Sequence, residues 1–177
     1  MNQPTSHKQA ALALFEDGCQ CAQATLCAFC DLTGLSMEQS MGLAASFGGG
    51  MARMREVCGA LSGAFMAAGL ILCRTKPGDT AAKDRHYRLT QYMAACFKQR
   101  MDSIYCHRIL SLPPLAQTPV STPRSPAFYS ERSRCADAVA VAADVLDEIL
   151  AAHESGTLDT VLSDARCVET TEFLNQR

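Results

Sequence analysis

Hydrophobic positions repeat along most of the chain with the three-to-four-residue period of an amphipathic helix. Glycine, proline and capping residues interrupt this pattern and mark where each segment ends. No stretch shows the two-residue alternation that is typical of a half-buried strand. The pattern therefore predicts helices over residues 7–16, 20–32, 36–46, 57–73, 79–101, 103–110 and 133–153.

Local signals fix several of these boundaries. Gly34 follows the second segment at a C-cap position, and Ser36 with Gln39 forms a capping box for the third. Asp79 is placed to cap the fifth segment. In the last long segment the apolar spacing puts Cys135 on the buried face.

A proline-rich segment separates that last long helix from the rest of the chain. Five of the seven prolines lie in residues 111–131, which we expect to be an irregular connector. We expect one domain over residues 1–177, with a core of residues 8–110 and 132–155 and a tail, 156–177, that holds at most one weak helix. The sequence thus predicts an all-α, single-domain helical bundle of about six to seven helices.

The segment at 57–73 is uncharged and only just long enough to cross a membrane. Because Gly59, Gly63 and Gly69 lower its hydrophobicity, we interpret it as a buried helix and expect no membrane insertion. The N-terminus lacks the charged and then apolar regions of a secretory signal. These features favour a cytoplasmic protein in a reducing compartment.

Composition then narrows the choice of function. The formal net charge of -2 provides no basic field for phosphate backbones, so we expect no nucleic-acid partner. The chain has 10 cysteines, and in a reducing compartment cysteines are more often metal ligands or redox groups than structural disulfides. Function is therefore sought among the cysteines.

Several familiar cysteine motifs are absent from the sequence. Cys27 and Cys30 have CxxC spacing, but Asp31 follows them, which excludes a CxxCH haem site. No zinc-finger spacing, ferredoxin run, phosphate loop or other nucleotide motif is present, and neither is a Ser-His-Asp order or an HExxH sequence. If cysteines converge, helix packing must bring them together. We interpret five cysteines as small buried hydrophobes: Cys27, Cys30, Cys73, Cys96 and Cys167.

Two further residues receive no firm role. The sequence assigns no function to Cys19. His107 follows Cys106 and could act as a base or ligand beside it, but adjacent helical residues face apart, so a surface histidine is the favoured interpretation.

Cys58 differs from the other cysteines in its surroundings. It follows three consecutive glycines at 48–50 and lies at the first turn of the 57–73 helix, where free amides and the helix dipole favour an anion. Arg53 and Arg55 add positive charge nearby. In such a place the pKa of a thiol can fall to roughly 3.5–7.5, which would make Cys58 a nucleophile or a metal-binding thiolate.

Three stretches together resemble the redox-active protein family named for its C_GCAxxG_C_C cysteine pattern: GCQCAQATL at 18–26, FGGGM at 47–51 and CGALSG at 58–63. The last of these matches the family's Cys-Gly-Ala-x-x-Gly at every fixed position, and the resemblance extends over residues 8–151. The family's four characteristic cysteines correspond here to Cys21, Cys58, Cys106 and Cys135.

The resemblance implies redox chemistry at these four cysteines, with Cys58 and Cys21 as the candidate catalytic thiols. Four thiolates from separate helices could hold an iron-sulfur cluster, which makes a redox or electron-transfer protein our first hypothesis. Without a metal, Cys58 and Cys21 could cycle between dithiol and disulfide as a thiol-disulfide oxidoreductase. The same soft ligands would suit zinc or copper(I) in a non-catalytic metal-binding or interaction module. Whether the protein is an enzyme, its redox partner and its oligomeric state stay open.

Overall fold

The structure is a computed structural model, and it describes residues 6–73, 76–113 and 133–163. Within these ranges the chain forms nine α-helices and no β-strand, which confirms the predicted all-α class. The helices are α1 (His7–Glu16), α2 (Cys21–Ala28), α3 (Cys30–Thr33), α4 (Met37–Ala44), α5 (Gly59–Leu72), α6 (Thr80–Met101), α7 (Cys106–Ile109), α9 (Ser133–Glu154) and α10 (Leu158–Ser163). A 3₁₀ turn, η1 (Ala45–Phe47), continues α4.

The number of helices in the described ranges exceeds the expected six to seven for two reasons. The segment predicted at 20–32 is broken at Phe29, which separates α2 from α3. The short helix α10 follows α9 in the expected tail. Most of the predicted connector, residues 114–132, and the tail beyond residue 163, including Cys167, lie outside the described residues.

The predicted caps are present. Ser36 accepts a hydrogen bond from the Gln39 amide, and the Gln39 side chain accepts one from the Ser36 amide, completing the capping box of α4. Asp79 caps α6 by accepting from Ala82 N at 2.9 Å. Gly34 ends α3 with a φ of 74°, in the left-handed region that glycine adopts readily.

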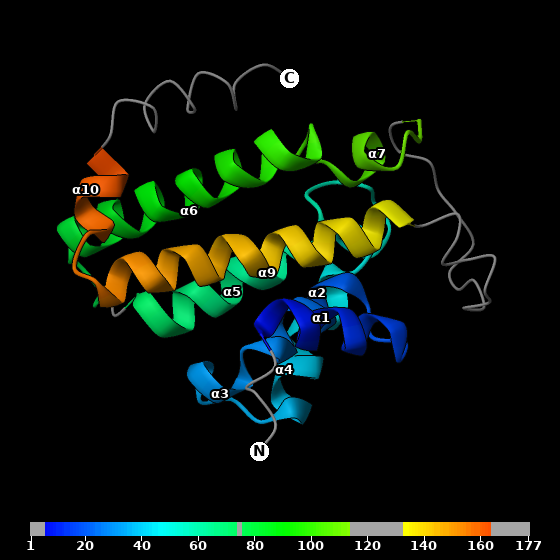
Figure 1. Ribbon diagram of the computed structural model, residues 1–177, viewed down its shortest axis with the longest axis horizontal. Helices are drawn as coiled ribbons and strands as arrows, with labels where there is room; N and C mark the ends of the chain where they lie inside the picture. The colour runs from blue at the N-terminus through cyan, green and yellow to red at the C-terminus, as the bar shows by residue number, and fades with distance from the viewer. Residues whose placement is uncertain (1–5, 74–75, 114–132, 164–177) are drawn as a thin grey trace.

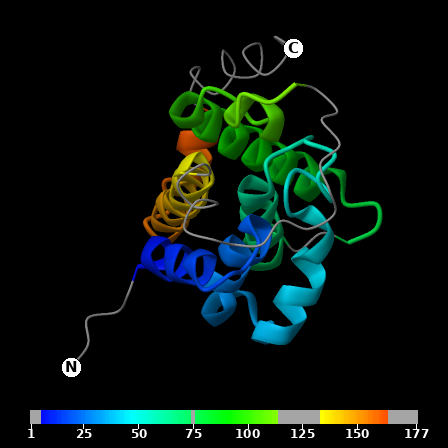
Figure 2. The same ribbon diagram turned by 90° about the vertical axis from the view of Figure 1, so that its right-hand side faces the viewer.

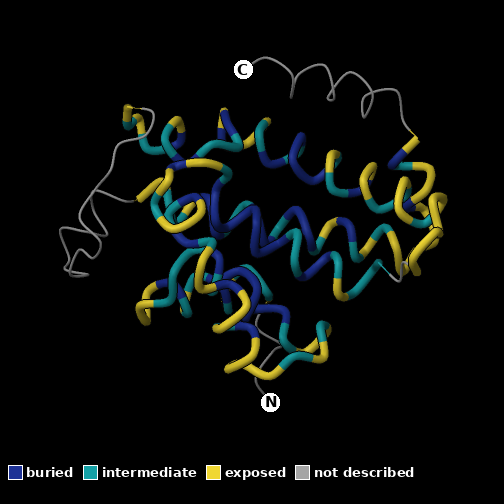
Figure 3. The backbone as a smooth tube through the Cα atoms, turned by 180° about the vertical axis from the view of Figure 1, so that it is seen from behind, coloured by how far each residue is buried: buried dark blue, intermediate teal, exposed yellow. Residues whose placement is uncertain are grey.

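The long helix α9 lies at the centre of the bundle. It packs against α1, α2, α5 and α6, and in Figures 1 and 2 α6 lies above it and α1 below. Its buried face is small and apolar: Ala138, Val139, Ala142, Ala143, Val145, Leu146 and Ile149. Figure 3 shows the buried residues gathered in the middle of the molecule, where α2, α5 and α9 form most of the hydrophobic core.

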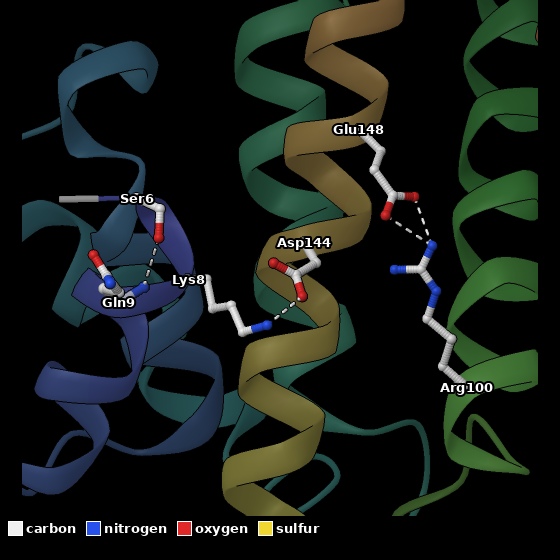
Figure 4. Close-up of polar contacts among 6 residues, drawn as sticks. All are labelled: Ser6, Lys8, Gln9, Arg100, Asp144 and Glu148. Carbon is white, nitrogen blue, oxygen red and sulfur yellow. Dashed lines mark hydrogen bonds and ion pairs between the residues drawn. The ribbon is translucent and has the colours of Figure 1, made fainter. Parts of the chain in front are cut away.

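Ion pairs on the surface add to this packing (Figure 4). Lys8 of α1 donates to Asp144 of α9 at 2.8 Å, and Arg100 of α6 donates to both carboxylate oxygens of Glu148 at 2.6 and 2.8 Å. Because these groups are partly exposed, each pair contributes at most about 1 kcal/mol. Burial of the apolar core, to which α9 contributes seven residues, therefore outweighs these pairs in stabilising the bundle.

The uncharged segment predicted as a buried helix is α5, whose first turns are enclosed. Gly59, Ala60, Leu61, Ser62, Gly63 and Ala64 are all buried. Among the described residues, no helix is both long enough and apolar enough to span a membrane.

Glycine lets α5 approach α2 at backbone distance. A Cβ added at Gly63 would lie 2.5 Å from the carbonyl oxygen of Ala22 and 3.1 Å from Cβ of Thr25. Both atoms belong to a packed helix and cannot move aside cheaply. The contact that holds the N-terminal ends of α2 and α5 together therefore depends on the missing side chain.

We expect Gly63→Ala to lower the free energy of unfolding by about 1–3 kcal/mol, as overpacking does, although alanine is the better helix former. The matched control is Gly42→Ala in α4, where an added Cβ meets nothing within 4 Å and stability should rise by about 0.5–1 kcal/mol. Urea unfolding followed by circular dichroism measures both. Equal effects of the two substitutions would contradict the close contact.

Candidate functional site

Two of the predicted cysteines are joined through the backbone. Cys58 is the N-cap of α5 and Cys106 is the first residue of α7. An isolated antiparallel bridge pairs Val57 with Tyr105, and on either side of it Cys58 N donates to Ile104 O at 2.8 Å and Cys106 N donates to Glu56 O at 2.7 Å. These bonds fix two cysteines that are 48 residues apart in sequence side by side.

Cys21 reaches the same place from α2, where it is the first helical residue. Its Sγ lies above the first residue of α5, since a Cβ added at Gly59 would be 2.7 Å from that sulfur. The thiol of Cys58 lies close enough to those of Cys21 and Cys106 for each to act on its ionisation. The structure therefore brings together three of the four predicted cysteines, and we call Cys21, Cys58 and Cys106 the thiol centre.

The fourth cysteine, Cys135, lies in the first turn of α9. It is half-buried and packs against the hydrophobic core. The neighbouring Arg134 donates to Met101 O at 3.3 Å and to Asp102 Oδ2 at 3.2 Å, which ties this end of α9 to the segment leading to Cys106. Figure 1 shows this end of α9 at the same end of the molecule as α7 and the loop before α5. That Cys135 joins the thiol centre stays a prediction.

The loop between η1 and α5 has an uncommon backbone. Five consecutive residues, 49–53, have φ between 50° and 69°, and Arg55 has a φ of 65°. Non-glycine residues normally enter this left-handed region singly, and each costs roughly 1–3 kcal/mol. Such strain persists only where surrounding contacts enforce it, and here the loop leads directly into Cys58.

Glycine is required within this loop at Gly50. It has a φ of 69°, and an added Cβ would lie 2.6 Å from Cβ of Cys106. The three glycines predicted to allow close backbone approach therefore do so at least here, next to a cysteine of the thiol centre.

The left-handed turn also places Arg55 inside the protein. Arg55 is only 4 % exposed, and its Nη1 donates to Cys106 Sγ at 3.9 Å. His107 fixes the backbone of this arginine, since its Nδ1 lies 2.9 Å and its amide N 3.2 Å from Arg55 O. His107 is thus partly buried and supports Arg55, where the sequence had favoured a surface histidine.

The pKa of Cys58 differs from the sequence-based expectation. Burial raises the pKa of this thiol well above its usual range, and the neighbouring Cys21 and Cys106 raise it further. The amides of Ala60 and Leu61 at the start of α5 lower the pKa of Cys58, as expected at a helix N-terminus, but their effect is smaller. The prediction of an activated Cys58 thiolate is therefore wrong for the metal-free protein, because the sequence showed the helix end but not the burial or the two adjacent thiols.

Cys19, Cys27 and Cys30 form a second group of thiols, which we call the α2–α4 thiol cluster. The thiols of Cys30 and Cys19 both lie close enough to that of Cys27 to act on its ionisation. Burial, followed by these neighbours, raises the pKa of Cys27 to about 12. From the sequence, Cys27 and Cys30 were interpreted as small buried hydrophobes, and their CxxC spacing was the signal that they could meet.

Apart from the thiols, two features bear on ligands. Within residues 6–73, 76–113 and 133–163, no group of three or more His, Cys, Asp or Glu side chains is arranged to hold a single metal ion. A cavity of about 380 Å³ lies beside the segment that carries Cys106, and its polar wall includes Ser103, Arg108 and Arg134.

Comparison with known proteins gives one match. The model of the family described as "Putative redox-active protein (C_GCAxxG_C_C)" matches residues 19–149. No match was found among curated proteins or among solved structures. The matched range contains the thiol centre, Cys135 and the whole α2–α4 thiol cluster.

We expect Cys58 in the reduced, metal-free protein to react with iodoacetamide at pH 7 at least tenfold more slowly than in the unfolded chain, because a rise of one pKa unit lowers the thiolate fraction about tenfold. The rate at which Cys58 is alkylated in the folded protein should keep rising above pH 9, where the same thiol in the unfolded chain is already ionised. Mass spectrometry of the labelled peptides measures this.

A Cys21→Ser variant tells whether Cys58 is labelled slowly because its pKa is raised or because the reagent cannot reach it. The substitution removes one cause of the raised pKa, so the pH profile of Cys58 labelling should move to lower pH. The matched control is Cys96→Ser, which removes a partly buried thiol of α6 and should leave the pH profile of Cys58 labelling unchanged. Faster labelling of Cys58 in the folded chain at pH 7 would show an activated thiolate instead.

Proposed function

This chain belongs to the C_GCAxxG_C_C family of redox-active proteins, and on that premise we propose that it is a cysteine-based redox protein acting through Cys21, Cys58 and Cys106, with Cys135 as the fourth cysteine. One observation carries the proposal: Cys58, at the start of α5, lies close to the thiols of Cys21 and Cys106, which come from two other helices. A structural role for each cysteine alone does not require this convergence.

We further propose that these four cysteines hold an iron-sulfur cluster. Thiolate sulfur is the usual ligand of such clusters, so the donor set fits. Several buried thiols cannot all ionise without compensating positive charge, as the raised pKa of Cys58 indicates. Metal cations provide that charge and displace the thiol protons. Because the irons of a cluster bind separate cysteines, the sulfurs need not converge on the single point that one metal ion requires.

A bound cluster would supply one-electron chemistry, with a potential set by its charge, its hydrogen bonds and its exposure. The chain's own groups control the last two of these. Arg55 donates to Cys106 Sγ, which would favour the more negative state of the centre. Burial of Cys58 and Cys106 at 6 % exposure keeps water away and would disfavour that state.

A second candidate is a cofactor-free dithiol-disulfide couple between Cys58 and Cys21. The closeness of Cys21 Sγ to the start of α5 favours it. Against it stands the third thiol, Cys106, which is held beside Cys58 although a two-cysteine couple does not need it. The geometry therefore supports the cluster better.

The route for a redox partner is proposed to be the cavity beside Cys106. Ser103 and Ile109, which line it, flank Cys106 in sequence. Arg108 gives its wall positive charge, while Arg134 is paired with Asp102, which also lines the cavity. An anionic reductant or an acidic protein surface suits such a wall. Assembly of a cluster needs reduced thiols, which is consistent with a reducing compartment such as the cytoplasm.

Anaerobic purification followed by iron, sulfide and zinc analysis tests the cluster. We expect iron with an equal amount of labile sulfide in the wild-type chain, loss of both in Cys58→Ala, and retention in the control Cys96→Ala, with circular dichroism confirming that each variant is folded. Zinc without sulfide would contradict the cluster and support a metal-binding module. A reversible disulfide without metal would support the second candidate.

The place of Cys135 is tested separately. If it is the fourth ligand, Cys135→Ala should lose at least half of the bound iron on gel filtration, because one iron is left without its thiolate. Cys73→Ala, which removes a half-buried thiol at the C-terminal end of α5, should retain it. Equal retention by both variants would remove Cys135 from the centre.

A further inference from the structure

We propose that Cys27 and Cys30 form a second redox site, a dithiol that is oxidised to an intramolecular disulfide by a low-molecular-weight disulfide. The site belongs to the α2–α4 thiol cluster and is separate from the thiol centre. The thiols that act on Cys27 are Cys30 and Cys19, whereas those that act on Cys58 are Cys21 and Cys106.

The backbone allows the two sulfurs to bond. Cys27 lies near the end of α2, Cys30 is the first residue of α3, and the helix is interrupted between them at Phe29. Residues three apart in a helical turn have Cα atoms roughly 5 Å apart, inside the roughly 4.4–6.8 Å span of a disulfide. The Cys30 thiol lies close enough to that of Cys27 to act on its ionisation. Formation of the bond therefore needs only a small adjustment at the break.

The surroundings assign different roles to the two cysteines. Cys27 is 2 % exposed, whereas Cys30 is partly exposed and can be reached by a small disulfide. Cys30 Sγ lies 3.2 Å from the hydroxyl of Ser40, which is fully buried on α4. The Cys27 thiol lies close enough to Cys30 for that neighbour to act on its ionisation. Cys30 is therefore the accessible thiol that attacks first, and Cys27 is the buried thiol that resolves the mixed disulfide.

The reaction then balances in two steps. The Cys30 thiolate attacks one sulfur of the disulfide RSSR, the RS–SR bond breaks, and one RS⁻ leaves to form a mixed disulfide between Cys30 and R. The Cys27 sulfur then attacks Cys30 Sγ, gives up its proton, and displaces the second RS⁻. Two thiols have lost two electrons and two protons, and RSSR has become two RSH.

Cys19 is the competing partner for Cys27. Its Sγ donates to the Met41 sulfur at 3.8 Å, and it also lies near Cys27. Cys27 and Cys30 are favoured because they are three residues apart on either side of a helix break and because Cys30 acts more strongly than Cys19 on the ionisation of Cys27. The identity of the bonded pair is therefore the observable that decides the proposal.

The full-length reduced protein is equilibrated with glutathione disulfide, quenched with acid, alkylated and digested with chymotrypsin. Cleavage after Phe29 separates the two cysteines, so their bond appears as two cross-linked peptides. We expect that product in wild type and in the control Cys96→Ala, and its complete loss in Cys30→Ala, which changes a partly exposed residue. Three results would overturn the proposal: a Cys27 thiol that can still be alkylated after the treatment, a disulfide between Cys19 and Cys27, or a stable glutathione adduct on Cys30.

The same experiment on Cys58→Ala keeps this proposal independent of the proposed function. The Cys27–Cys30 bond should still form in that variant, whether or not wild type binds iron. Loss of the bond in a folded Cys58→Ala chain would show that oxidation depends on the thiol centre, and would contradict a separate site.

Discussion

The cost of placing negative charge on neighbouring, buried sulfurs is the constraint on which the thiol centre depends. Cys58 is almost shielded from solvent and lies close to Cys21 and Cys106, so its thiolate is disfavoured first by burial and then by the adjacent thiols. Such a group of sulfurs can carry negative charge only if positive charge is brought to it. The buried Arg55 brings part of that charge to Cys106, and metal cations would bring more.

The segments around the thiol centre are held together by close approaches of their backbones. Gly63 lets α5 lie against the carbonyl of Ala22, and Gly59 leaves room for Cys21 Sγ. The Val57–Tyr105 bridge ties the start of α5 to that of α7. The left-handed loop before it turns Arg55 inward at a backbone cost of a few kcal/mol, which the surrounding contacts must offset.

Sequence periodicity predicted the helices well because most of them have a buried face, and the caps at Ser36 and Asp79 were readable from local residue types. The break at Phe29 was not predicted, since no glycine or proline marks it. At the site, the family pattern selected Cys21, Cys58 and Cys106, but the pKa of Cys58 was predicted in the wrong direction. Burial and the positions of distant thiols are tertiary properties, and the run of left-handed residues at 51–53 follows from no local preference.

The most direct measurement is the position of the sulfur atoms in a crystal of the reduced chain, located by their anomalous scattering without reference to reactivity. We expect the sulfurs of Cys21, Cys58 and Cys106 to form one group, with Cys58 next to both others, and those of Cys19, Cys27, Cys30 and Met41 to form a second. A Cys58 sulfur with neither Cys21 nor Cys106 beside it would contradict the account.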